Sequence, residues 1–106
     1  MNLTALTELH AAMPVEIHHY GANKPTVPYG VWAEDGDVSP AADNRRSTII
    51  LSGTTDYFTH QENDANVDAI QAVFDGAAWI SAQIGSIQYE DDTGLLHYEW
   101  TWEALV

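Results

Sequence analysis

The sequence predicts one domain of the α+β class, in the order α-β-β-β-α-β-β, with about five mostly antiparallel strands and two helices packed on one face. Three observations support this prediction. The 106 residues show no break in composition and leave room for one core. Two segments repeat apolar residues with helical spacing, and several others are rich in β-branched residues or alternate apolar and polar positions. We therefore expect residues 1–106 to form a single domain.

Two segments have the pattern of amphipathic helices. In the first, the inward positions recur at helical spacing: Leu3, Leu6, His10 and Met13. This spacing predicts a helix over residues 3–12, which Pro14 ends. The second helix is expected over residues 64–75, with a cap at Asn63-Asp64 and an end at Gly76.

Five further segments predict strands: residues 15–20, 29–34, 45–58, 82–90 and 95–103. Gly53, in the longest of them, predicts a bulge or a close approach of another backbone. Residues 91–94 end in Gly94 and predict the turn of a hairpin between the last two strands. Residues 35–44 combine Gly, Pro, Ser and acids without a period, which predicts a flexible loop.

The last predicted strand has one apolar face and one polar face. The apolar face, expected in the core, holds Leu96, Tyr98, Trp100 and Trp102, and the polar face holds His97, Glu99, Thr101 and Glu103. Trp79 falls outside any clear period, so we predict an exposed side chain that anchors a partner. For Trp32 the sequence leaves core, anchor and ligand stack open.

The chain is strongly acidic. Sixteen Asp and Glu face only Lys24, Arg45 and Arg46, which gives a formal net charge of −13. Three cations cannot form the basic stripe that phosphate binding needs, so we expect no affinity for nucleic acid and none for anionic membranes. The acids also fit two simpler interpretations, a solubility device or a habitat of high salt.

The sequence gives little support for a catalytic site or a metal site. There is no cysteine, and neither a GxSxG nucleophile context nor a glycine-rich phosphate loop is present. Glu16 with His18, and His97 with Glu99, would each share one strand face, yet two ligands do not make a site. The run 35–37, Asp-Gly-Asp, lacks the remaining ligand positions of a calcium loop. We therefore predict no enzyme activity, no cofactor and no metal.

Three segments carry a resemblance to a known family. They are AADNRRSTIILSGTTDYF (41–58), NDANVDAIQAVFDG (63–76) and SIQYEDDTGLLHYEWTWEAL (86–105). Together with the order of elements over nearly the whole chain, these segments resemble the tail-terminator, or tail-completion, proteins of long-tailed bacteriophages and prophages.

The resemblance implies a structural protein that assembles as a hexameric ring, caps the finished tail tube and joins it to the head connector. Its partners would be copies of itself, the tube protein and the connector, and DNA would pass through the ring without binding. The protein would lie in the virion tail after assembly in the host cytoplasm. The alternative is a small acidic binding or regulatory module that forms a dimer.

A closed ring uses heterologous contacts, in which one patch of a subunit meets a different patch of the next. Arg45 and Arg46 stand together beside the predicted loop, while acids dominate elsewhere. This segregation of charge predicts an interface that involves Arg45 and Arg46, the acids Asp35 and Asp37 of the loop, and Trp79.

Overall fold

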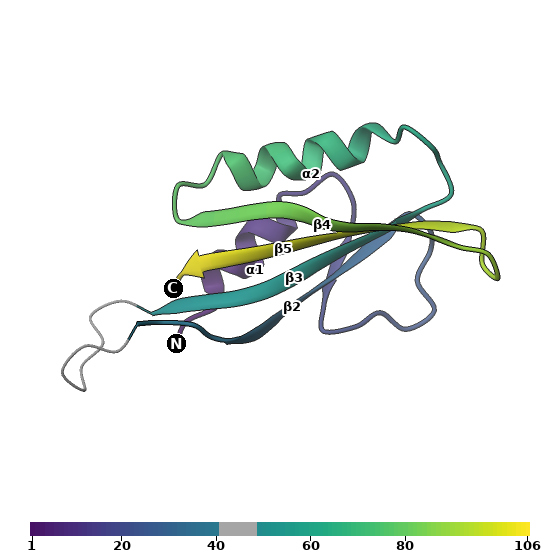
Figure 1. The fold of residues 1–106 in the computed structure, drawn as a ribbon. Coiled ribbons are helices and arrows are strands. Elements are labelled where there is room, and N and C mark those ends of the chain that lie inside the picture. The colour runs from purple at the N-terminus through teal and green to yellow at the C-terminus, as the bar shows by residue number, and fades with distance from the viewer. Residues whose placement is uncertain (41–48) are drawn as a thin grey trace.

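The protein is described here by a computed structural model that covers residues 1–40 and 49–106. Its elements are α1 (Thr4–Ala11), β1 (Ile17–His19), β2 (Tyr29–Asp37), β3 (Ile50–Thr59), α2 (Ala65–Asp75), β4 (Ile80–Glu90) and β5 (Leu95–Leu105). The order is the predicted one. Figure 1 shows β2, β3, β5 and β4 side by side, with α2 running along β4.

The strands form one five-stranded sheet in the order β1-β2-β3-β5-β4. β1 pairs with β2 in parallel, and the other three pairs are antiparallel. This mixed, mostly antiparallel sheet with two helices confirms the predicted α+β class. Gly94 has φ 71 at the end of the β4–β5 turn, a conformation that a residue without a Cβ adopts at little cost.

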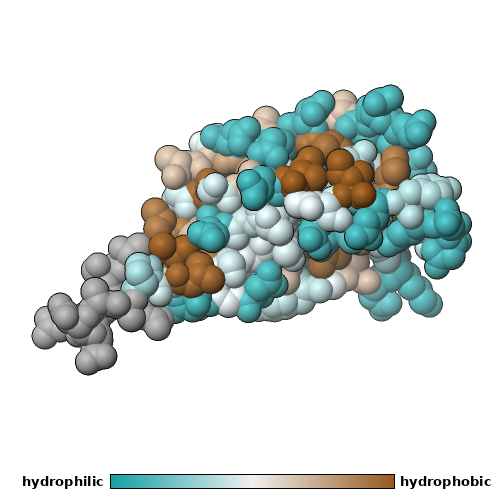
Figure 2. All heavy atoms as spheres, in the orientation of Figure 1, coloured by the Kyte–Doolittle hydropathy of each residue, from teal (hydrophilic) through white to brown (hydrophobic). Residues whose placement is uncertain are grey.

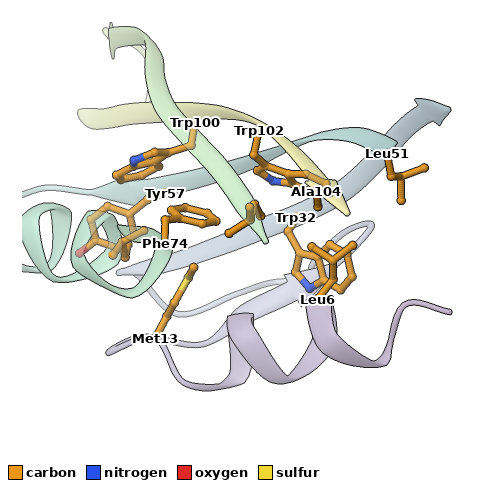
Figure 3. Packing of buried hydrophobic residues seen from close by; sticks show 11 residues of the cluster. Leu6, Met13, Trp32, Leu51, Tyr57, Phe74, Trp100, Trp102 and Ala104 are labelled. Atoms are coloured by element: carbon orange, nitrogen blue, oxygen red, sulfur yellow. The ribbon is translucent and has the colours of Figure 1, made fainter. Parts of the chain in front are cut away.

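Both helices pack on the same face of the sheet, as predicted. Leu6 of α1 and Phe74 of α2 are almost fully buried in one cluster with Trp32, Trp100 and Trp102 of the sheet. Figure 3 shows these side chains between the strands and the helices. The core positions predicted for Trp100 and Trp102 are confirmed, and Trp32 is also a core residue.

A buried histidine connects α1 to the sheet. The His10 Nδ1–H donates to the carbonyl of Leu6 at 2.8 Å, and Nε2 accepts from the Thr55 hydroxyl at 2.7 Å. The Thr55 oxygen in turn accepts from the indole N–H of Trp102 at 3.0 Å. Burial lowers the pKa of His10 to about 4, opposed by the hydrogen bond to Leu6 and assisted by the charge of His19. His10 is therefore neutral at pH 7.

Trp32 lies at the centre of a column of rings that fastens β1 to the core. His10 stacks on one side at 4.5 Å, His19 stacks on the other at 3.8 Å, and Tyr20 stacks on His19 at 3.7 Å. Glu34 accepts hydrogen bonds from His19 Nε2 at 2.8 Å and from the Tyr20 hydroxyl. Burial raises the pKa of Glu34, but the hydrogen bonds from Tyr20, His19 and the backbone, together with the charge of His19, leave the pKa below its ordinary value.

α2 begins at the predicted cap. Asp64 Oδ1 accepts from the backbone N–H of Asn66 at 2.9 Å. Its Oδ2 accepts from the hydroxyls of Tyr57 at 2.5 Å and Thr59 at 2.8 Å, both on buried positions of β3. Burial alone would raise the pKa of Asp64, and the hydrogen bonds from Tyr57, Asn66 and Thr59 lower it on balance. One carboxylate thus holds the helix start to the sheet.

The prediction of a flexible loop over residues 35–44 is wrong for its first three residues. β2 continues to Asp37, where Gly36 pairs with Ser52 and Asp37 with Leu51 of β3. An irregularity between Glu34 and Gly36 adds one residue, Asp35, to this strand. These residues are strand because β3 provides hydrogen-bonding partners for their backbone groups, which their composition does not indicate. Residues 41–44 of the predicted loop and residues 45–48 of the strand predicted over 45–58 lie outside the described residues.

Gly53 is the point of closest contact between β3 and the core. β3 has no bulge there, and the irregularity lies opposite, in β2. A methyl group on Gly53 would lie 2.3 Å from ring carbons of Trp102 and 2.6 Å from the carbonyl oxygen of Ala33. The predicted close approach is therefore confirmed, and a buried indole and a neighbouring strand together make it.

We expect Gly53→Ala to lower the free energy of unfolding by about 2 kcal/mol, because the new methyl displaces a packed ring and a strand. Urea denaturation followed by tryptophan fluorescence measures this. Gly36→Ala is the matched control on the paired strand, since open space surrounds Gly36. Equal stabilities of the two variants would contradict the contact between Gly53 and Trp102.

Candidate interaction surface

One face of the sheet has no helix on it in the described structure. Its side chains come from alternate positions of β2, β3, β5 and β4, opposite to those that enter the core. In the view of Figure 2, pale and hydrophilic residues cover most of the middle strands. Brown, apolar atoms gather between α2 and β4 and at the end where β3 begins. We call the helix-free side the uncovered face.

A row of rings crosses the uncovered face where β3 ends. Tyr29 pairs with Phe58, which pairs with His97. The rings stack at 4.9 Å between Tyr29 and Phe58 and at 4.3 Å between Phe58 and His97. These contacts fix three large side chains in a partly exposed apolar ridge.

Carboxylates border this ridge. The His97 Nε2–H donates to Asp56 Oδ1 at 2.7 Å, and His97 Nδ1 lies 3.8 Å from Glu90 Oε2. Asp56 also stands directly opposite Glu99 in the β3–β5 ladder. Its contact with His97 places Glu90 beside the same row, and burial, followed by the charge of Glu90, raises the pKa of Tyr29. We call Asp56, Glu90 and Glu99 the acidic border.

A shallow polar hollow lies on the uncovered face nearer the start of β3. Its volume is about 470 Å³, and its lining includes Asp35, Ser52, Gln83, Thr101 and Glu103. The side chains are hydroxyls, an amide and carboxylates, with no base in a hydrogen-bonded pair with a nucleophile among them. The hollow therefore offers hydrogen-bonding groups and negative charge to a partner.

A second feature is apolar and follows the edge strand β4. Ile84, Ile87 and Tyr89 are exposed by 37%, 59% and 62%. They pair with Trp100, Tyr98 and Leu96 of β5, so they lie on the same face of the sheet as the core. Their exposure shows that α2 does not cover them fully. An exposed strand edge with large apolar side chains is a surface suited to another protein chain.

The structure separates the predicted interface residues. Asp35 lies in the irregular part of β2 and lines the polar hollow, and Asp37 ends β2, where it accepts from the backbone N–H of Ser39 at 2.8 Å. Trp79, expected to be exposed, is instead half-buried and packs against the core beside the start of β4. Arg45 and Arg46 lie outside the described residues.

Of the two histidine–glutamate pairs considered for metal binding, Glu16 with His18 is formed and His97 with Glu99 is not. His18 Nδ1 lies 3.8 Å from Glu16, and His97 turns to Asp56 and Glu90 instead of to Glu99. No group of three or more His, Cys, Asp or Glu among the residues described has the arrangement of a metal site. The acids Asp35 and Asp37 belong to a strand, which is not the geometry of a calcium loop.

Sequence reasoning missed Asp56 and Glu90 as partners of His97. It compared residues along one strand, whereas these partners come from the two neighbouring strands. The strand period of two places Thr54, Asp56 and Phe58 on one face, and this was the only sequence signal for the position of Asp56 on the outer face. The register of the ladders, which no local pattern fixes, decides the rest.

A scan against protein-family models and a search of curated proteins both found no match for this chain. Neither of the two described helices of this chain has the length and the apolar character of a membrane span.

Proposed function

We propose that this protein is a structural subunit of a phage tail, a terminator that self-associates into a ring, caps the tail tube and joins it to the head connector. The observation that carries the proposal is the element order, with both helices on one face and a broad polar face that neither helix covers. Such a subunit has a core on one side and a surface for a neighbour on the other. The resemblance of the chain to tail-terminator proteins supplies the particular role.

The chemistry of the surface supports a role in assembly over a role in catalysis. The uncovered face combines a fixed ring ridge, an acidic border and a polar hollow, which are features that recognise a surface. A net charge of −13 would also let DNA pass the lumen of a ring without adhering, because phosphate is repelled.

We expect the purified protein to be mainly monomeric at low salt and to form larger oligomers as salt rises. The reason is that screening weakens repulsion between subunits of charge −13. Light scattering across a salt series at fixed protein concentration measures the change, and electron microscopy of the high-salt sample should show closed rings. A protein that stays monomeric at every salt and protein concentration would contradict ring formation.

The second candidate is a small acidic dimeric binding or regulatory module. The exposed apolar residues of the edge strand β4 favour it, because two copies joined along β4 would extend the sheet and bury Ile87 and Tyr89. This module would be a tight dimer at low concentration and insensitive to salt. The same light-scattering series therefore separates the two candidates.

A further inference from the structure

β4 forms one edge of the sheet, and β5 is its one strand neighbour among the described residues. The Leu105 N–H donates to the carbonyl of Trp79, so the alternation of the ladder turns the backbone groups of Ala82 away from β5. The Gln71 amide donates to the Ala82 carbonyl at 3.2 Å and covers the edge at this point. No described strand pairs with the part from 84 to 89, which we call the open edge.

The open edge lacks the charges that usually keep two strands from pairing. Residues 80–89 contain no Asp, Glu, Lys or Arg, although the chain carries −13, and the one irregularity of β4 has no charge beside it. Ile84, Ile87 and Tyr89 are exposed there instead. At the opposite edge, β2 continues beyond the three residues of β1 as the acidic, irregular segment 34–37. Charge and irregularity protect an edge, so β4 is the edge suited to pairing.

A hollow of about 520 Å³ lies beside the open edge. It is lined by Tyr89, by Gly94 and Leu96 across the hairpin, and by His60 and Glu62 of the segment before α2. Figure 1 shows the β4–β5 hairpin continuing past the start of α2, where this hollow lies. Because Tyr89 belongs to both features, a strand that pairs with the open edge brings its side chains to the hollow.

The hairpin end of β4 is acidic. Asp91 and Asp92 of the turn are exposed, and so is Glu62 at the hollow. Within the described part of the chain, Lys24 is the only Lys or Arg, and it lies in the connection before β2. A second copy would bring a further charge of −13 to this end, whereas a partner with Lys or Arg here is attracted. The charge therefore favours a different protein as the occupant.

We propose that the open edge of β4 binds an extended segment of a different, basic protein, which joins the sheet as a further strand. The segment has apolar residues at alternate positions, one of which enters the hollow, and Lys or Arg at the end that faces Glu62, Asp91 and Asp92. In this mode of recognition, main-chain hydrogen bonds give affinity and pockets for alternate side chains give specificity. The inference goes beyond the proposed ring and does not rest on it.

The test begins with a displayed library of random short peptides, selected on the full chain. The selected peptides should have apolar residues at alternate positions and Lys or Arg at one end. The variant with Asp91→Lys and Asp92→Lys should select peptides of the same apolar pattern with Asp or Glu at that end. Selection of the same basic peptides by both proteins would overturn the assignment of the basic end.

Ile87→Lys should weaken binding of a synthetic copy of the selected peptide roughly tenfold or more, because a lysine on the open edge opposes strand pairing. Isothermal titration calorimetry measures the affinity, and thermal melting checks that each variant is folded. Val38→Lys is the matched control, since Val38 is an exposed apolar residue beyond β2 and the change in charge is the same. It should bind the peptide like the wild type.

Two results would overturn the proposal. The first is equal affinity of Ile87→Lys and Val38→Lys for the peptide, which would place the peptide elsewhere on the protein. The second is self-association of the wild type without peptide, measured by sedimentation velocity, that Ile87→Lys abolishes and Val38→Lys does not. That result would make a second copy the occupant of the open edge. Ring formation at high salt is measured separately, so either result leaves it to its own test.

Discussion

Asp64→Ala should lower the free energy of unfolding by about 4 kcal/mol, the largest effect we expect from a single substitution. The loss of the N-cap of α2 accounts for about 1 kcal/mol. The larger part comes from the hydroxyls of Tyr57 and Thr59, which are buried and would lose their common acceptor, at about 1–3 kcal/mol for each group left without a partner. Urea denaturation followed by tryptophan fluorescence gives this value.

Two variants identify the cause. Asp64→Asn keeps an oxygen for the Asn66 N–H and should lose roughly half as much stability as Asp64→Ala. Asp68→Ala removes an exposed acid from the first turn of the same helix and should cost only a few tenths of a kcal/mol. If Asp64→Ala were no more damaging than Asp68→Ala, the carboxylate would not hold helix and sheet together.

The second large effect is a loss of stability in mild acid, caused by His10. The folded protein holds the pKa of His10 at about 4, mainly through burial, against an ordinary value of 6.5. Between these two values the unfolded chain binds a proton that the folded chain does not. The contribution is therefore complete above pH 6.5 and is lost as the pH falls toward 4, by about 3 kcal/mol in total.

Measurements of the free energy of unfolding at several pH values from 7 to 4 test this effect. His10→Gln cannot titrate, so its stability should start lower at pH 7 and fall less steeply than that of the wild type. His60→Gln is the control, since His60 is exposed, and it should reproduce the wild-type slope. Equal slopes for His10→Gln and the wild type would show that another group causes the acid sensitivity.

Acid should separate α1 from the sheet before it disturbs the start of α2. Asp64 has a lowered pKa, so its contribution is present above its ordinary value and is lost only as the pH falls through the lower, folded value. His10 loses its contribution to stability at higher pH, as the pH falls from 6.5 toward 4. Because His10 contacts Thr55 and stacks on Trp32, its protonation removes the neutral acceptor that ties α1 to β3 and disturbs a buried ring column.

Local sequence patterns were sufficient for the element order and much of the core. Both helices, the cap at Asp64 and the hairpin at Gly94 were predicted because each depends on residues within one or two turns of the chain. Trp100 and Trp102 were placed in the core by the alternation of β5, since the strand period of two assigns faces without knowledge of the partners.

The ends of β2 and the surroundings of single side chains needed the tertiary structure. Residues 35–37 have the composition of a loop, yet they are strand because β3 satisfies their backbone groups. Trp79 lies outside any period, and only packing against the core shows that it is half-buried.

By itself, the sequence determined the α+β class, the order of elements, the acidic surface and the rarity of cations. Only the tertiary structure decided which acids share a surface. Asp56, Glu90 and Glu99 come from three strands, and His97 meets the first two although the sequence paired it with the third. The physical reason is that composition and period are local properties, whereas strand register and the face left without a helix are set by contacts between residues distant along the chain.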